Sequence, residues 1–270
     1  MLGSHGPSDG LREERDPVQD SIHAFLDDSI TKEGIVCAAA VFPLERLQDA
    51  ESALQMAKVR VGVSVDTQLH CRILFAGDAR RGTPWENVEP DKIYEMAHDL
   101  CDALRPIGLQ PVVCLIDRAL IQPRFPSPDL PASMPSEKES ASLAYWAVAN
   151  HLVLGQPGTQ VRIWIDPDST RIPWGIRRSR ADKARTNFWI DLGAGQDPLR
   201  VELQIADRPK PPLLEVADLY AYITIQAHSG RGGQRIERFK KLYDIIKPQN
   251  LRCHFPDGPQ QWQEGSNRRD

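Results

Sequence analysis

The chain has 270 residues, of which 41% are hydrophobic and 26% are charged, and its formal net charge at pH 7 is -4. This length suits one large domain or two small ones, and the apolar content excludes a chain that is disordered throughout. The small negative charge does not exclude a nucleic-acid partner, because a basic groove can lie on an acidic protein.

The five cysteines occur without CxxC spacing, and the histidines show no zinc-ligand spacing. This pattern favours buried thiols in a reducing cytoplasm over disulfides or a zinc site. The longest apolar stretches are too short to cross a bilayer, and the N-terminal segment lacks the apolar core of a signal peptide. We therefore expect a cytoplasmic protein with no membrane segment.

The first part of the chain predicts a tail followed by a β-hairpin and a helix. Residues 1–20 are polar and rich in glycine and charge, which favours a disordered N-terminal tail. Residues 21–28 have the pattern of a strand, and residues 34–42 form an unbroken apolar run typical of a second, fully buried strand. Residues 44–60 have the apolar spacing of an amphipathic helix.

The next segments predict a strand, a helix and another strand before a long loop. Residues 68–77 have a strand pattern, residues 89–108 have helical spacing, and residues 110–117 form a buried strand. Residues 119–138 contain five prolines and no periodicity. Such a loop is either a lid or binding loop, or a disordered surface insertion.

The second half of the chain repeats the alternation of helices and strands. Residues 139–154 predict a helix, residues 160–169 a strand, residues 177–188 a basic helix, and residues 199–207 a sixth strand. Alternation of this kind after an initial hairpin indicates an α/β fold, with a mixed β-sheet flanked by helices on both faces.

The last core helix is expected over residues 212–227, with prolines before it and a glycine after it. A further helix is expected at residues 234–246, followed by a polar C-terminal tail over residues 251–270. Residues 21–250 then form a single domain.

Several acidic residues follow apolar strands, and one interrupts the apolar face of a helix. Those at strand ends are Asp27, Asp28, Asp117, Asp166 and Asp207, and Asp218 lies on the helix at 212–227. The carboxyl ends of strands are where α/β proteins assemble their sites. Clustered carboxylates repel one another unless a cation lies between them, and Mg²⁺ or Mn²⁺ prefers oxygen ligands.

Each acid also has an ordinary structural interpretation. An aspartate at a strand end often forms a turn or caps a helix, and this interpretation is favoured for Asp117 and Asp168. For Asp27 and Asp166 the two interpretations stay open. A carboxylate on an apolar helix face needs a partner, so Asp218 is the acid that most requires an explanation.

A basic cluster suggests a partner for these acids. It consists of Arg171, Arg177, Arg178, Arg180, Lys183 and Arg185. Such a cluster suits the phosphate backbone of DNA or RNA, but it is also the composition of a solvated surface. A second basic run contains Arg231, Arg235, Arg238, Lys240 and Lys241.

Four separated segments resemble the family catalogued as domain of unknown function 3800, which is ribonuclease H-like. They are FLDDSI, the triplet Gln68-Leu69-His70, WIDPDS and LLEVADLYAY. The resemblance covers most of the chain from Ser21 to about His228. The positions that match the family's polar residues are Asp27, Asp28, His70, Asp166 and Asp218, with Asp207 at a further acidic position.

The resemblance implies a ribonuclease H-like sheet and a metal-dependent nuclease. It implies that Asp27, Asp166 and Asp218 hold Mg²⁺ or Mn²⁺, with Asp28 and Asp207 in support. A histidine alone on a strand is more often structural, but the resemblance gives His70 the role of positioning or protonating groups near the scissile phosphate.

The chain departs from the family pattern at two positions. Gln68 replaces an acid, for which Asp66 could substitute, and Glu215 replaces a glutamine. The alternative hypothesis is therefore a catalytically inactive ribonuclease H-like module that binds nucleic acid or a protein partner.

Overall fold

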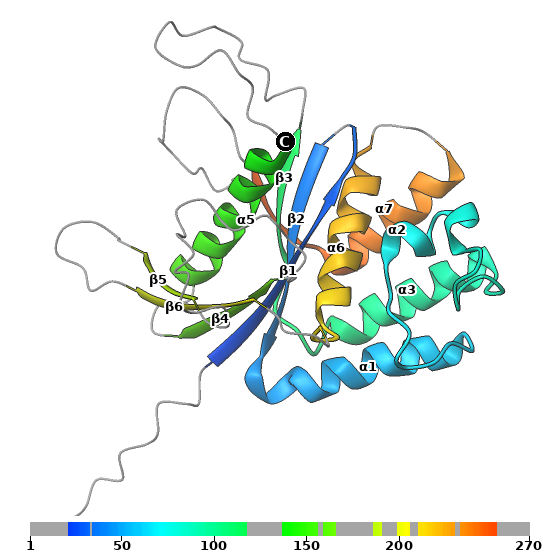
Figure 1. Cartoon of the computed structure of the whole chain (residues 1–270), viewed down its shortest axis with the longest axis horizontal. Coiled ribbons are helices and arrows are strands. Elements are labelled where there is room, and N and C mark those ends of the chain that lie inside the picture. The colour runs from blue at the N-terminus through cyan, green and yellow to red at the C-terminus, as the bar shows by residue number, and fades with distance from the viewer. Residues whose placement is uncertain are drawn as a thin grey trace, which may run out of the picture.

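The computed structural model of the chain describes eight segments, which form a sheet and its flanking helices (Figure 1). These segments are residues 21–32, 34–117, 137–155, 159–165, 186–190, 199–205, 210–229 and 233–252. No helix within them is both long and apolar enough to cross a membrane.

The described strands form one seven-stranded sheet in the order β5-β6-β4-β1-β2-β3-β7. They are β1 (Ser21–Ile30), β2 (Gly34–Pro43), β3 (Val112–Asp117), β4 (Gln160–Ile165), β5 (Thr186–Ile190), β6 (Leu199–Ile205) and β7 (Gln249–Arg252). Strands β1, β2 and β3 pair antiparallel, whereas β4 runs parallel to β1 and β6 parallel to β4. The sheet is therefore mixed, as the alternation of the sequence predicts.

Helices cover both faces of this sheet (Figure 1). They are α1 (Leu47–Arg60), α2 (Cys71–Leu74), α3 (Pro90–Leu104), α5 (Glu137–Leu154), α6 (Leu214–Ala227) and α7 (Gln234–Ile246), with short 3₁₀ turns at Leu44–Arg46 and Gly77–Arg80. Helix α6 packs on β1 and β2 from one side, and α5 packs on β2 and β3 from the other. The expectation of an α/β fold with helices on both faces is confirmed.

Strand β2 lies at the centre of two hydrophobic cores because its side chains alternate between the faces. Val36 and Phe42 belong to the core beneath α6, whereas Ile35 and Val41 belong to the core beneath α5. Both faces of the strand are covered, which explains why its sequence is apolar throughout.

Helix α6 is buried nearly all round, although the sequence predicts a single apolar face. Leu214 and residues 216–225 are buried, because the sheet lies on one side of the helix and α7 on the other. A helix enclosed in this way is apolar around its circumference.

Two predicted elements are wrong. The strand expected from residue 68 does not form, because Trp85 and Glu215 hydrogen-bond the backbone of Gln68 and Leu69, and helix α2 begins at Cys71. The basic helix expected to reach residue 188 is wrong from Thr186 onwards, where strand β5 begins and pairs with β6. A β-branched and aromatic composition favours this strand.

The C-terminal strand was not expected from the sequence. Strand β7 pairs in parallel with β3, so residues 251 and 252 belong to the sheet and not to the expected tail. Its four residues are too few to show a strand pattern of their own, and only the partner strand defines them.

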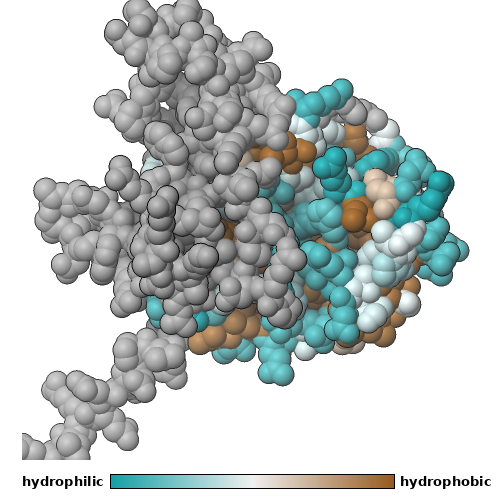
Figure 2. Space-filling model, in the orientation of Figure 1, coloured by the Kyte–Doolittle hydropathy of each residue, from teal (hydrophilic) through white to brown (hydrophobic). Residues whose placement is uncertain are grey.

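The described surface in Figure 2 is mainly hydrophilic, with separate hydrophobic groups. Two apolar side chains of α1 are prominent among the exposed ones: Met56 is 57% exposed and Val59 is 58% exposed. The two side chains are three residues apart on one side of α1, and some exposed apolar surface is ordinary for a folded protein.

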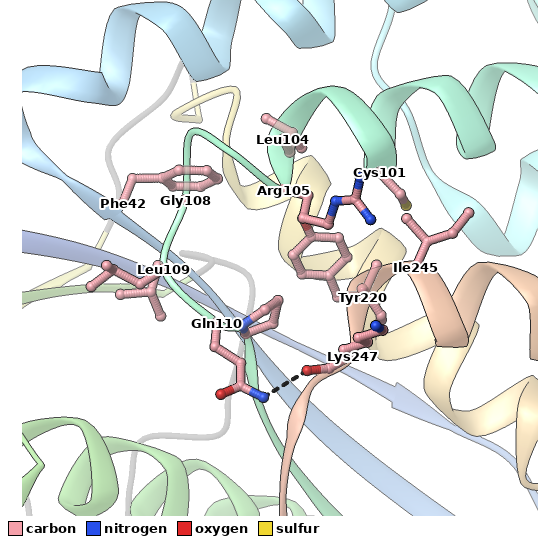
Figure 3. A pocket seen from close by; sticks show the side chains of 13 residues that line it. Phe42, Cys101, Leu104, Arg105, Gly108, Leu109, Gln110, Tyr220, Ile245 and Lys247 are labelled. Atoms are coloured by element: carbon pink, nitrogen blue, oxygen red, sulfur yellow. Dashed lines mark hydrogen bonds between the residues drawn. The ribbon is translucent and has the colours of Figure 1, made fainter.

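A cavity of about 280 Å³ lies where β2, α3, α6 and α7 meet (Figure 3). Its lining includes Phe42, Leu104 and Tyr220, and the side-chain amide of Gln110 donates a hydrogen bond to the backbone carbonyl of Lys247 at 2.8 Å beside it. Of the predicted site acids that the structure describes, Asp27, Asp28 and Asp218, none lines this cavity.

Candidate functional site

The two acids at the end of the first apolar run in β1 point to opposite faces of the sheet. Phe25 belongs to the core beneath α6 and Leu26 to the core beneath α5. Strand alternation therefore directs Asp27 to the α6 face and Asp28 to the α5 face. On the α5 face the hydroxyl of Tyr145 donates a hydrogen bond to Asp28 Oδ1 at 3.1 Å.

This arrangement corrects the prediction that Asp28 supports the same site as Asp218, because the sheet lies between the two side chains. Asp27 keeps the predicted position, on the face covered by α6. Its Oδ1 accepts a hydrogen bond from the backbone N–H of Asp28 at 2.8 Å, which fixes the carboxylate at this point of the strand.

Asp218 is buried on α6 and has the partners that its burial requires. Only 8% of the residue is exposed. Its Oδ2 accepts a hydrogen bond from the backbone N–H of Cys71 at 2.8 Å and lies 3.2 Å from Nδ1 of His70. Neither contact uses Oδ1, and that atom has no hydrogen-bond partner among the described residues.

His70 precedes helix α2 and extends its ring towards solvent. Its side chain is 51% exposed. The hydrogen bond with Asp218 raises the pKa of the imidazole above its ordinary value, although partial burial and the positive charges of Lys210 and Arg72 oppose the rise. Nδ1 faces Asp218, so Nε2 is the ring nitrogen left for a ligand.

The buried thiol of Cys71 lies close enough to Asp27 and Asp218 to be affected by the charge of both. Burial is the main cause that raises the pKa of this thiol well above its ordinary value, and the negative charges of Asp218 and Asp27 raise it further. The charges of both carboxylates therefore act on the same buried thiol, one from β1 and one from α6. His70 and Asp218 are in contact, and Asp27 points to the face of the sheet that α6 covers, whereas a single site of all three residues stays a prediction.

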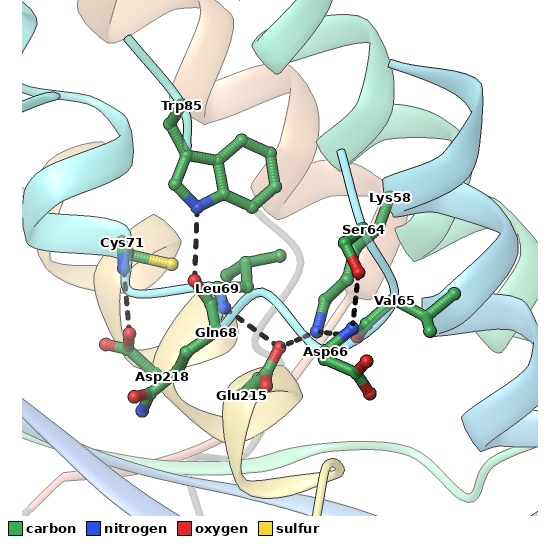
Figure 4. A network of polar contacts seen from close by, with 10 residues as sticks. All are labelled: Lys58, Ser64, Val65, Asp66, Gln68, Leu69, Cys71, Trp85, Glu215 and Asp218. Carbon is green, nitrogen blue, oxygen red and sulfur yellow. Dashed lines mark hydrogen bonds and ion pairs between the residues drawn. The ribbon is translucent and has the colours of Figure 1, made fainter. Parts of the chain in front are cut away.

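Glu215 and Lys58 form a buried ion pair beside this group (Figure 4). Lys58 Nζ lies 2.6 Å from Glu215 Oε2, and the two side chains are 3% and 14% exposed. Burial raises the pKa of the Glu215 carboxyl, whereas the hydrogen bond and charge of Lys58 oppose this rise. A role for Lys58 was not predicted from the sequence. Its position four residues after the buried Leu54 of α1 was the available signal.

Two predicted acids and the predicted basic cluster lie outside the described residues. The acids are Asp166 and Asp207, and the basic residues are Arg171, Arg177, Arg178, Arg180, Lys183 and Arg185. Residues 119–136 of the predicted proline-rich loop also lie outside them, and residues 137 and 138, predicted as its end, instead begin α5. The register nevertheless pairs Leu26 of β1 with Ile165 of β4, the residues that precede Asp27 and Asp166 in the sequence.

Three residues of the second basic run, Arg235, Arg238 and Lys240, have partners within the fold. Arg235 donates a hydrogen bond to the Tyr222 hydroxyl at 3.0 Å, and Arg238 forms an ion pair with Asp91. Lys240 Nζ lies 2.9 Å from Glu237 Oε1. These contacts favour a structural role for much of the run, on the surface of α7.

Asp27 and Asp218 both provide carboxylate oxygens on the α6 face of the sheet. Oxygen atoms are the ligands that hard cations such as Mg²⁺ prefer. Within the described part of the chain, no group of three histidine, cysteine, aspartate or glutamate side chains is placed to hold a metal ion. A complete set of protein ligands would therefore require an additional residue such as Asp166.

Comparisons of the chain with protein-family models, with curated proteins and with solved structures find no match.

Proposed function

We propose that the chain is a ribonuclease H-like, metal-dependent nuclease that hydrolyses phosphodiester bonds. The observation that carries the proposal is the position of Asp218. Its buried carboxylate is held by His70 and the Cys71 N–H on the face of the sheet to which Asp27 points. The antiparallel hairpin of β1 and β2 lies within the sheet, and β4 pairs in parallel with β1. This arrangement of strands supports the ribonuclease H-like part of the proposal.

Asp27, Asp218 and Asp166 are the proposed ligands of Mg²⁺ or Mn²⁺. Leu26 of β1 pairs with Ile165 of β4. Asp27 and Asp166 are the next residues in the two strands' sequences, and this register supports the choice of Asp166. A bound divalent ion would supply positive charge to stabilise the phosphate oxygens and a water of lowered pKa. Asp207 remains a proposed supporting acid two residues after the end of β6.

His70 is the proposed proton donor of the site. Its pKa is raised by Asp218, so the imidazole holds a proton at higher pH than an ordinary histidine does. Nδ1 bonds to Asp218, which directs Nε2 outward, where it can donate a proton to a leaving oxygen. The positive charges of Arg72 and Lys210 near His70 favour an anionic substrate.

The test is cleavage of single-stranded DNA, double-stranded DNA, RNA and RNA–DNA hybrids with Mg²⁺ or Mn²⁺ and with EDTA. Asp27→Asn and Asp218→Asn should each lower the rate by about 100-fold or more, because a lost ligand removes transition-state stabilisation. Asp28→Asn is the matched control, because its carboxylate lies on the opposite face. Metal-independent cleavage, or full activity of Asp218→Asn, would refute the proposal.

A non-catalytic module that binds nucleic acid or a protein partner is the second candidate. The neutral Gln68 at the position of a family acid favours it. For a nucleic-acid partner, this candidate predicts salt-dependent binding that survives EDTA and Asp27→Asn, without cleavage. Neutralising Arg177, Arg178 and Arg180 should weaken that binding, whereas metal-dependent turnover excludes the candidate.

A further inference from the structure

The segment before helix α2 is held at several backbone groups by side chains (Figure 4). Lys58 Nζ donates to the carbonyl of Val65 at 3.3 Å, and Trp85 Nε1 donates to the carbonyl of Gln68 at 3.1 Å. The N–H of Leu69 donates to Glu215 Oε2 at 3.0 Å. This segment follows a path that neither a strand nor a helix imposes, so these side chains determine it.

Two acids of α6 hold the backbone on either side of His70. Glu215 binds the N–H of Leu69, one residue before it, and Asp218 binds the N–H of Cys71, one residue after it. The two acids are three residues apart on the helix and therefore lie on one side of it. The position of His70 relative to Asp218 thus depends on both attachments.

The Glu215 attachment depends in turn on Lys58. The same Oε2 of Glu215 contacts Lys58 Nζ at 2.6 Å and the Leu69 N–H at 3.0 Å. Lys58 Nζ also donates to the carbonyl of Val65. The same ammonium group therefore contacts the segment at Val65 and contacts Glu215, which binds the segment at Leu69. Buried ion pairs add little net stability compared with apolar side chains, and a directional role is one reason to keep them.

We propose that Lys58 and Glu215 are a positioning pair that fixes the imidazole of His70 against Asp218. The pair does not touch a reacting atom. It holds the backbone of residues 65–69, and that backbone sets the distance between His70 Nδ1 and Asp218 Oδ2. The consequence for catalysis rests on the proposed nuclease function, whereas the effect on His70 does not.

The position of the His70 ring provides a measurement that is independent of catalysis. Nδ1 of His70 and the N–H of Cys71 both meet Oδ2 of Asp218, at 3.2 Å and 2.8 Å. A displaced backbone before Cys71 therefore moves the imidazole away from α6 and weakens the bond of the Cys71 N–H. Nuclear Overhauser contacts between the His70 ring and α6, and hydrogen exchange of the Cys71 amide, report these two changes.

The experiment compares the full-length chain with Lys58→Met/Glu215→Leu, which removes both buried charges without leaving either unpaired. In this variant the NMR contacts between the His70 ring and α6 should be lost and the Cys71 amide should exchange about 10-fold faster, while the resonance of the exposed His98 stays unchanged. The matched control is Lys240→Met/Glu237→Leu, which removes an exposed ion pair of α7 and should leave both histidines unchanged.

Glu215→Gln is the second variant, which keeps an oxygen acceptor for Leu69 and loses the charge that binds Lys58. It should weaken the contacts of the His70 ring with α6 in the same direction. Unchanged ring contacts and an unchanged exchange rate of the Cys71 amide in a folded Lys58→Met/Glu215→Leu or Glu215→Gln variant would overturn the proposal and leave the pair as a purely structural contact.

Activity gives a separate readout. If the unmodified chain cleaves nucleic acid, Lys58→Met/Glu215→Leu should lower kcat on the order of 10- to 100-fold with little change in KM, because His70 is displaced. Unchanged kcat would contradict the catalytic consequence. If the unmodified chain does not cleave, the nuclease proposal fails, and the NMR contacts of the His70 ring still decide whether the pair positions His70.

Discussion

Asp218 provides the sharpest test of how the site is built, through a comparison of Asp218→Ala with Asp218→Asn. Its Oδ2 accepts from the buried N–H of Cys71 at 2.8 Å and contacts His70 Nδ1 at 3.2 Å. Alanine removes the acceptor altogether. Asparagine has nearly the same shape and keeps a side-chain oxygen, so it removes mainly the negative charge.

The cost of the alanine substitution follows from these contacts. A buried N–H without an acceptor costs about 1–3 kcal/mol. The lost contact with His70 adds about 0–1 kcal/mol, because the imidazole is 51% exposed and solvent screens it. Removing the buried charge offsets part of this cost. We therefore expect Asp218→Ala to lower the free energy of unfolding by about 1–3 kcal/mol, and Asp218→Asn by about 1 kcal/mol or less.

Urea unfolding in the presence of EDTA measures this difference without a contribution from bound metal. The control is Asp244→Ala, which removes an exposed acid of α7 and should change the free energy by about 0.5 kcal/mol or less. If Asp218→Ala is as stable as Asp218→Asn, the Asp218 carboxylate does not hold the Cys71 N–H, and the reasoning is refuted.

Two further predictions concern the opposite face of the sheet and the effect of pH. Tyr145→Phe removes the hydrogen bond to Asp28 and should cost about 1 kcal/mol in urea unfolding while leaving any nuclease activity intact; lost activity in the folded variant would contradict the assignment of faces. The raised pKa of His70 means that its pairing with Asp218 contributes stability below the ordinary histidine pKa of about 6.5, and that this contribution is lost as the pH rises through the folded-state pKa. His70→Ala should therefore lower the urea midpoint more at about pH 5.5 than at about pH 9, and an equal effect at both would exclude the charged pair.

The unbroken apolar run of β2 predicts a strand buried on both faces, and the structure confirms it. The same local patterns locate α3, α5 and α7. These predictions succeed because a strand or helix of sufficient length displays its period in its own residues. Strand alternation also separates Asp27 from Asp28, and this inference was available from the sequence although it was not drawn there.

The segment around His70 shows why local patterns fail elsewhere. Residues 68–77 contain enough apolar side chains to suggest a strand, but their hydrogen-bond partners lie far away in the sequence. Glu215 and Trp85 bind this backbone, so no local propensity determines its conformation. The same reason hides β7, which exists only through its pairing with β3.

A carboxylate on an apolar helix face needs a partner whatever the fold, because its burial costs free energy, so the requirement for Asp218 can be predicted from the sequence. That the partners are His70 and the Cys71 N–H, and that α6 covers the face of Asp27 and not that of Asp28, follows only from the packing of the folded chain. The same holds for the pair of Lys58 and Glu215. Contacts of this kind join residues distant in the sequence, and they depend on which helix covers which face of the sheet, which the period of a single element does not encode.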